Sequence, residues 1–331
     1  MGEIILHVGP HKTGSTYIQK YLYLNREVLS EHGWVYPEPI ELDPTVDHYG
    51  HIKLGFDETQ ISYYLNHSQG KRIIFSSENL YTLENEQIGR LFKSIFDAGF
   101  KEIVVVFYAR HPIERIYSMI KESIKEGWYY SIPEFLSIYL LKPFTRKEVN
   151  YTIFLDTIKK FSSKIVIVDY EHFSKTSLLL PLLELMGIPP DRFNLTNEIV
   201  NLGIKIEFAE ILRWLNLKFA NSGINPSGYK VFSIVRQVLL TNSKLKEKRT
   251  ILQNALSQYK KSITVGSFIS SSLESLLLNK YFNNFYKGAH ESWDREVVID
   301  YISEEWMLNK RLLKILDELY QNCREHASHI T

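Results

Sequence analysis

Four short runs of apolar residues stand out in the first half of the chain. Each is rich in β-branched residues, is too short for a buried helix, and lacks the polar alternation of a strand with one face in water. Such runs predict strands that are buried on both faces. The four predicted strands are Ile4–Val8, Arg72–Phe75, Ile103–Tyr108 and Ile165–Asp169.

Residues with helical periodicity occupy the intervals between these strands. Pro112 follows a strand end directly, where it suits the first turn of a helix, and Gly187 is placed to end another helix. Strands that alternate with helices indicate an α/β fold with a parallel sheet. The predicted helices of this part are 15–31, 84–97, 112–126, 151–161 and 177–186.

The pattern changes near residue 200. Beyond it the periodicity is helical, and no run predicts a strand. We therefore expect an α/β core over residues 1–200 and a helical C-terminal extension over residues 201–331 that packs on the core. The predicted helices of the extension are 203–221, 227–240, 244–262, 270–286 and 303–325.

Composition narrows the class of protein. Hydrophobic residues make up 44% and charged residues 23%, as in ordinary globular proteins. The net charge of +1 does not favour nucleic acid or an anionic membrane as a partner. The single cysteine, Cys323, cannot form an internal disulfide, which favours a reducing compartment. No signal-peptide pattern and no membrane-length apolar run is present, so we expect a soluble cytoplasmic protein without a membrane span.

The segment HVGPHKTGSTY, between the first predicted strand and the first predicted helix, has the glycine spacing of a phosphate-binding loop. Gly9, Gly14 and Thr16 match Walker A positions, but Ser15 occupies the lysine position and the lysine comes earlier, as Lys12. A strand, a glycine-containing loop and a helix in this order present backbone N–H groups to an anion. The sequence therefore predicts a P-loop-type parallel β-sheet flanked by helices; the alternative is a plain strand–turn–helix connection.

A second motif follows the third predicted strand. Arg110 comes at the end of that strand, Pro112 lies two residues later and Ser118 lies eight residues after the arginine. A guanidinium fork together with a hydroxyl is suited to select a phosphate group. The alternative for Arg-x-Pro alone is an ordinary helix start.

Together these two motifs resemble those of the PAPS-dependent sulfotransferases. Members of that superfamily transfer a sulfuryl group from 3′-phosphoadenosine 5′-phosphosulfate (PAPS) and release the bisphosphate nucleotide PAP. Their 5′-phosphosulfate loop has the form Lys-[Ser/Thr]-Gly-[Ser/Thr]-Thr, and Lys12–Thr16 has the same form. The resemblance spans residues 4 to about 190, and the N-terminal part is similar to a bacterial branch of carbohydrate sulfotransferase-like proteins.

The resemblance implies roles for individual residues. Lys12 would stabilise the leaving phosphate, and Arg110 with Ser118 would bind the 3′-phosphate. Tyr17 and Tyr170 would lie near the adenine, although each could equally be an ordinary packed tyrosine. The 5′-phosphate would be held by the amides and hydroxyls of Thr13, Gly14, Ser15 and Thr16.

An acceptor hydroxyl needs a general base. We favour Glu78, which follows the end of the second predicted strand, because ligands of open α/β sheets bind at the carboxyl ends of the strands. Glu78 could instead cap a helix or pair with a lysine. His48 and His51, in the connection before that strand, are the other candidates for the base or for an acceptor contact. No cluster has metal-ligand spacing, so no metal is expected.

The predicted reaction is transfer of a sulfuryl group to the hydroxyl of an acceptor, preferably a carbohydrate or glycolipid. A protein tyrosine or a small phenol or alcohol is an alternative acceptor. A kinase or NTPase is a rival class, because the fourth predicted strand ends in Asp169, as a Walker B strand does. A non-catalytic nucleotide-binding protein of the same fold is a further alternative. Oligomeric state is not predicted.

Overall fold

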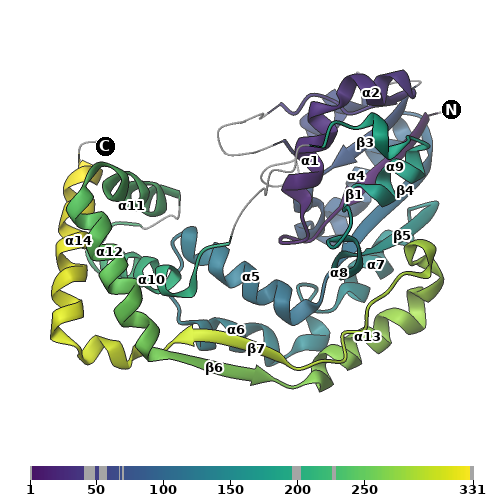
Figure 1. Cartoon of the computed structure of the whole chain (residues 1–331). Coiled ribbons are helices and arrows are strands. Elements are labelled where there is room, and N and C mark those ends of the chain that lie inside the picture. The colour runs from purple at the N-terminus through teal and green to yellow at the C-terminus, as the bar shows by residue number, and fades with distance from the viewer. Residues whose placement is uncertain are drawn as a thin grey trace. The chain divides into compact units, whose positions relative to one another are not determined.

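The computed structural model describes residues 2–40, 49–51, 58–66, 68, 71–195, 203–225 and 229–328. The chain forms two compact units, each assembled from separate stretches of sequence. Unit 1 consists of Met1–Arg115, Pro143–Asn201 and Ser267–Arg295, and unit 2 of Ile116–Lys142, Leu202–Gly266 and Glu296–Thr331. Residues 267–295 thus belong to unit 1, although residues 202–266, which precede them in the chain, belong to unit 2. Figure 1 shows the elements of both units.

Unit 1 is built on a five-stranded sheet in the order β2-β3-β1-β4-β5. Every neighbouring pair is parallel, with Ile4 of β1 opposite Ile73 on one side and Ile103 on the other. The strands are β1 (Gly2–Val8), β2 (Trp34–Val35), β3 (Arg72–Ser76), β4 (Phe100–Ala109) and β5 (Lys164–Asp169). The four predicted strands are therefore confirmed, whereas the two-residue β2 was too short to give a pattern.

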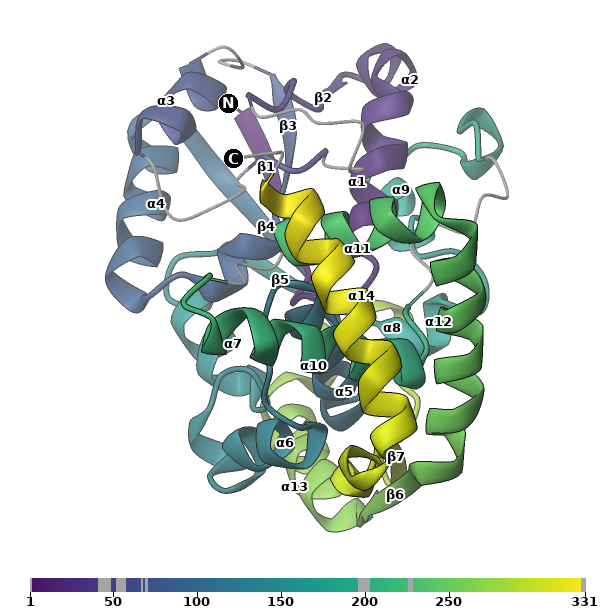
Figure 2. The same ribbon diagram turned by 90° about the vertical axis from the view of Figure 1, so that its left-hand side faces the viewer.

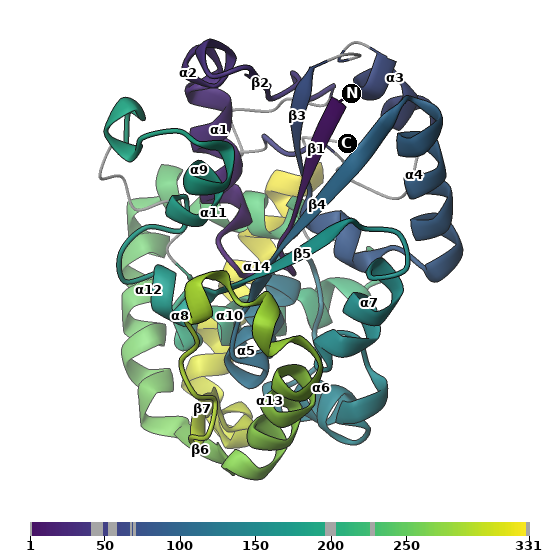
Figure 3. The same cartoon turned by 90° about the vertical axis from the view of Figure 1, so that its right-hand side faces the viewer.

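Helices cover both faces of this sheet (Figures 2 and 3). Alternate residues of β1 point to opposite faces, so Ile4 and Leu6 belong to one buried cluster and Ile5 belongs to the other. One face packs against α1 (Ser15–Leu24), α2 (Arg26–Glu31) and α9 (Leu180–Met186). The other packs against α3 (Glu58–Asn66), α4 (Asn85–Asp97), α7 (Tyr151–Ile158) and α13 (Ser267–Tyr281).

Two boundaries predicted from glycine and proline chemistry are confirmed. The helix α5 (Pro112–Lys125) begins at Pro112, and α9 ends at Gly187, which has a left-handed backbone with φ of 71°. The short helix α8 (Tyr170–Phe173) follows β5 directly. Within the described ranges, the 3-10 helices are η2 (Glu78–Thr82), η3 (Pro143–Thr145), η4 (Pro190–Arg192), η5 (Ser257–Tyr259), η6 (Phe282–Asn284), η7 (Tyr286–Gly288) and η8 (Glu304–Leu308).

Unit 2 is mainly helical but contains two strands, so the expectation of no strand beyond residue 200 is wrong. The helix expected over 244–262 ends at Leu256, and β6 (Lys260–Val265) pairs antiparallel with β7 (Val297–Ile302). The two strands are separated by the whole of α13, so no hairpin signal marks them. Besides most of α5, the helices are α6 (Ile132–Leu140), α10 (Ile206–Asn221), α11 (Tyr229–Thr241), α12 (Ser243–Leu256) and α14 (Lys310–Ser328).

None of the helices in the described ranges has the length and apolarity needed to cross a membrane.

Candidate functional site

The loop between β1 and α1 has a strained backbone. Lys12 has a φ of 73°, a left-handed conformation that is uncommon for a residue with a side chain. Gly14 has a φ of 80°, and a Cβ added there would lie 2.4 Å from Leu178 Cδ1. The buried hydroxyl of Thr13 donates to the Pro10 carbonyl over 2.7 Å, which fixes the loop from within.

The N-terminus of α1 suits an anion. Gly14 is its N-cap, makes no side-chain capping bond, and no acidic residue lies in the first turn. The first amides of a helix lack intrahelical partners and carry the positive end of the helix dipole. An anionic group placed beside Ser15 and Thr16 would therefore be stabilised by backbone donors.

Two arginines form hydrogen bonds with the backbone at the crest of this loop, which consists of His11 and Lys12. Arg110 Nη1 donates to the Lys12 carbonyl over 2.8 Å, and Arg115 Nη1 donates to the His11 carbonyl over 3.3 Å. Arg115 is 1% exposed, and its remaining bonds go to the Tyr151 hydroxyl and the Glu148 carbonyl. The crest that carries Lys12 is thus held by two cations from the β4–α5 segment. Arg115 was not predicted, because nothing in its sequence context separates it from a surface arginine.

The Nε of the Arg110 guanidinium group forms no hydrogen bond among the described residues. Its side chain is 19% exposed, and its Nε lies 3.8 Å from Glu171 Oε1 without a hydrogen-bond partner among the described residues. The guanidinium carbon lies 4.8 Å from the ring centroid of Tyr170, a cation–π distance. Arg110 and Tyr170, predicted separately from β4 and β5, are therefore neighbours.

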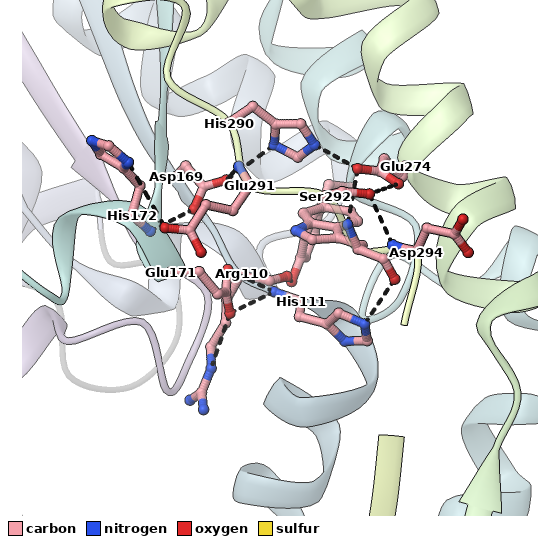
Figure 4. A network of polar contacts seen from close by, with 12 residues as sticks. Arg110, His111, Asp169, Glu171, His172, Glu274, His290, Glu291, Ser292 and Asp294 are labelled. Carbon is pink, nitrogen blue, oxygen red and sulfur yellow. Dashed lines mark hydrogen bonds and ion pairs between the residues drawn. The ribbon is translucent and has the colours of Figure 1, made fainter. Parts of the chain in front are cut away.

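Glu171 and His111 form a buried polar pair beside Arg110 (Figure 4). Both carboxylate oxygens of Glu171 accept from the His111 backbone N–H, at 3.0 and 3.2 Å. Burial raises the pKa of Glu171 to about 7 although that hydrogen bond opposes the shift. Burial, with Arg295 nearby, lowers the pKa of His111 to about 4. Glu171 therefore titrates near neutral pH next to the predicted nucleotide site.

Asp169, at the end of β5, is fully engaged by protein groups (Figure 4). Its Oδ1 accepts from the His172 N–H at 2.9 Å, and its Oδ2 contacts His290 Nδ1 at 3.0 Å and the Glu291 N–H at 2.9 Å. His290 Nε2 contacts Glu274 Oε1 at 2.7 Å. Burial lowers the pKa of His290, but the two carboxylates outweigh it and the net shift is upward. This network, which was not predicted, fastens residues 290–293 to the end of β5.

Glu78 lies at the first position of η2, just after β3. Its Oε1 is 3.6 Å from the Nδ1 of His11, the residue before Lys12. The two side chains are 29% and 40% exposed, so a ligand can reach them. Ser77 caps η2 by accepting from the Asn79 N–H, and Ser76 contacts the buried His7 over 2.7 Å. The chain thus brings the predicted base to the loop that bears the predicted lysine.

The other predicted residues are distributed more widely. Ser118 lies on the part of α5 that belongs to unit 2. Tyr17 is half-buried, with its ring 4.7 Å from that of Tyr21. His51 is 2% exposed, and its nitrogens contact the Pro37 carbonyl at 2.9 Å and the Ser76 N–H at 3.0 Å, so it is packed in the interior. His48 lies outside the described residues.

Across the described ranges, no group of three or more His, Cys, Asp or Glu side chains is arranged to hold a metal ion. The loop, the α1 terminus and Arg110 provide groups suited to bind an anion, and the partly exposed carboxylate of Glu78 lies beside the loop. Comparison with known proteins found no matching family model, no matching curated protein and no matching solved structure.

Proposed function

We propose that the protein is a PAPS-dependent sulfotransferase, with a carbohydrate or glycolipid hydroxyl as the preferred acceptor. The observation that carries the proposal is the hydrogen bond from Arg110 to the Lys12 carbonyl. It joins the two motifs on which the resemblance rests, one after β1 and one after β4. A donor with a 5′-phosphosulfate and a 3′-phosphate needs two such anion-binding elements side by side.

In the proposed reaction the acceptor oxygen attacks the sulfur atom of the donor. The bond between that sulfur and the bridging phosphate oxygen breaks, and PAP leaves. Glu78 takes the acceptor proton, and Lys12 neutralises the charge that develops on the leaving phosphate. Arg110 binds the 3′-phosphate, and the amides of the loop together with the Thr16 hydroxyl hold the 5′-phosphate.

The contacts of Asp169 weigh against a magnesium-dependent kinase or NTPase. A Walker B aspartate needs a carboxylate oxygen for the metal or its water shell. Both oxygens of Asp169 already accept hydrogen bonds from the protein, and the side chain is 1% exposed. The lysine position of the Walker loop is occupied by Ser15.

The proposal is tested by incubating the protein with ³⁵S-labelled PAPS and a panel of neutral oligosaccharides, glycolipids, tyrosine peptides and phenols. We expect labelled sulfate on a carbohydrate hydroxyl together with an equal amount of PAP. Label on a phenol or a tyrosine peptide alone would contradict the preferred acceptor class. Binding of PAP without label on any acceptor would favour a non-catalytic nucleotide-binding protein.

A further inference from the structure

Three consecutive aromatic side chains are exposed in unit 2, just after α5. Trp128, Tyr129 and Tyr130 are 45%, 37% and 43% exposed. The rings of Tyr129 and Tyr130 are stacked with centroids 5.5 Å apart, and Trp128 lies 6.0 Å from Tyr130. A group of large apolar side chains that stays in contact with water commonly marks a binding surface.

These side chains line a pocket of about 530 Å³. The opposite side is formed by the end of α10 and the residues after it, including Ala220, Gly223 and Asn225. Glu126 and Asn225 supply polar groups, and the lining residues that the structure describes include no lysine or arginine. A pocket of this composition suits a neutral ligand that has both apolar faces and hydroxyl groups, and it disfavours an anion.

The backbone beneath the three rings is held by buried polar residues of α10. Asn216 Nδ2 donates to the Trp128 carbonyl over 3.0 Å, and Arg213 Nη1 donates to the Tyr129 carbonyl over 3.2 Å. Asn216 is 1% exposed and Arg213 is 3% exposed. Glu210 in turn holds Arg213 through two bonds of 2.7 and 2.8 Å.

The hydrogen bonds from Arg213 and Asn216 fix the backbone of residues 128–130, while the three aromatic rings remain exposed to water. A surface that is ordered before the ligand arrives loses less entropy on binding.

We propose that this pocket binds a pyranose ring of a neutral carbohydrate. The C–H face of the sugar stacks on Trp128 or Tyr130, and its hydroxyls form hydrogen bonds with Asn225 and Glu126. The inference rests on the proposed function in that the acceptor proposed there is a carbohydrate. Its evidence is nevertheless independent, because the pocket lies entirely within unit 2.

Trp128 provides a direct readout. Of the five tryptophans, all of which fall in the described ranges, the other four are at most 3% exposed: Trp34, Trp214, Trp293 and Trp306. Quenching of fluorescence by acrylamide therefore reports mainly on Trp128. We would titrate the full-length protein with cellotetraose, chitotetraose and maltotetraose, and with AMP as an anionic aromatic probe.

We expect at least one tetrasaccharide to protect Trp128 from acrylamide with a saturable dependence, and AMP to give no protection. Tyr130→Ala should weaken binding about tenfold, which corresponds to the loss of one good stacking contact. Tyr63→Ala, at an exposed tyrosine of unit 1, should leave binding unchanged. Absence of protection by all three sugars, or an equal effect of both variants, would overturn the inference.

The same samples would be tested for stabilisation by PAP. Stabilisation by PAP without protection by sugars would overturn only the carbohydrate site. Protection by sugars without stabilisation by PAP would leave the site standing and refute the sulfotransferase proposal. The two failures are therefore distinguishable.

Discussion

Arg110 Nη1 donates a hydrogen bond of 2.8 Å to the carbonyl oxygen of Lys12, ninety-eight residues earlier in the chain. The bond connects the end of β4 to the crest of the loop that follows β1, the neighbouring strand. Lys12 itself has a positive φ of 73°. A cation that binds one phosphate of a nucleotide would therefore also set the position of the loop that binds another.

Lys12→Met should abolish most of the sulfuryl transfer and leave much of the PAP affinity. Lys12 is proposed to act on charge that develops during the reaction, and loss of such an interaction costs about 100-fold or more in kcat. Turnover of labelled PAPS and the Kd for PAP would be measured together. Lys93→Met, at an exposed lysine of α4 paired with Asp97, is the control and should change neither. An equal loss of PAP binding and turnover in Lys12→Met would instead indicate a binding role.

Glu78→Gln should reduce turnover by about 100-fold to 10,000-fold, the range typical of a lost general base. PAP binding should be unchanged, because the side chain is not assigned to the nucleotide. The control is Glu86→Gln, at an exposed glutamate in the first turn of α4. Normal turnover in Glu78→Gln would rule out this carboxylate as the base.

Gly14→Ala should destabilise the protein more than Gly99→Ala. Both glycines have positive φ, 80° and 89°, so an added Cβ strains both by about 1 kcal/mol. At Gly14 the new atom would also meet Leu178 at 2.4 Å, whereas nothing lies within 4 Å of the corresponding atom at Gly99. Because Leu178 Cδ1 is the end of a half-buried side chain that can move, we expect an additional loss of about 1 kcal/mol for Gly14→Ala in urea unfolding. Equal losses would show that the loop relaxes around the methyl group.

Glu171→Gln should change the pH dependence of stability. Burial raises the pKa of this carboxyl from 4.5 to about 7, so the folded protein keeps a proton that the unfolded chain releases. The wild type should therefore lose stability relative to the variant as pH rises from about 4.5 to about 7. The glutamine carbonyl can still accept from the His111 N–H.

Urea unfolding of wild type and Glu171→Gln across pH 4.5–8 provides the measurement. His111, with its pKa lowered to about 4, acts in the opposite direction, because folding expels its proton and stability rises with pH up to about 6.5. That contribution is present in both proteins and cancels in the difference. A difference that does not depend on pH would contradict the raised pKa of Glu171.

The central sheet could be predicted because its strands are buried on both faces and therefore appear as continuous apolar runs. The position of the loop between β1 and α1 could also be predicted, because Gly9, Lys12 and Gly14 lie close together in the sequence. Unit 2 was predicted less well. The pair β6–β7 joins segments on either side of α13, and pairing across such a distance leaves no local signal.

The polar network of unit 1 could not be predicted for the same reason. His290 lies 121 residues from Asp169 and contacts it only because residues 267–295 return to unit 1. Arg115 is a buried cation whose partners are mostly backbone carbonyls, which have no side-chain signature. For His51 the sequence suggested a residue open to an acceptor, whereas the structure packs its ring against Phe75, with centroids 4.5 Å apart.

The measurement that tests the central claim most directly is a thermal-shift titration with PAP, AMP, ADP and ATP–Mg²⁺. A ligand that binds only the folded state raises its stability by mass action. We expect PAP to stabilise the wild type far more than AMP does, and this preference to disappear in Arg110→Ala but persist in Arg192→Ala, a control at an exposed arginine paired with Glu31. Stabilisation by ATP–Mg²⁺ with no response to PAP would contradict the sulfotransferase proposal.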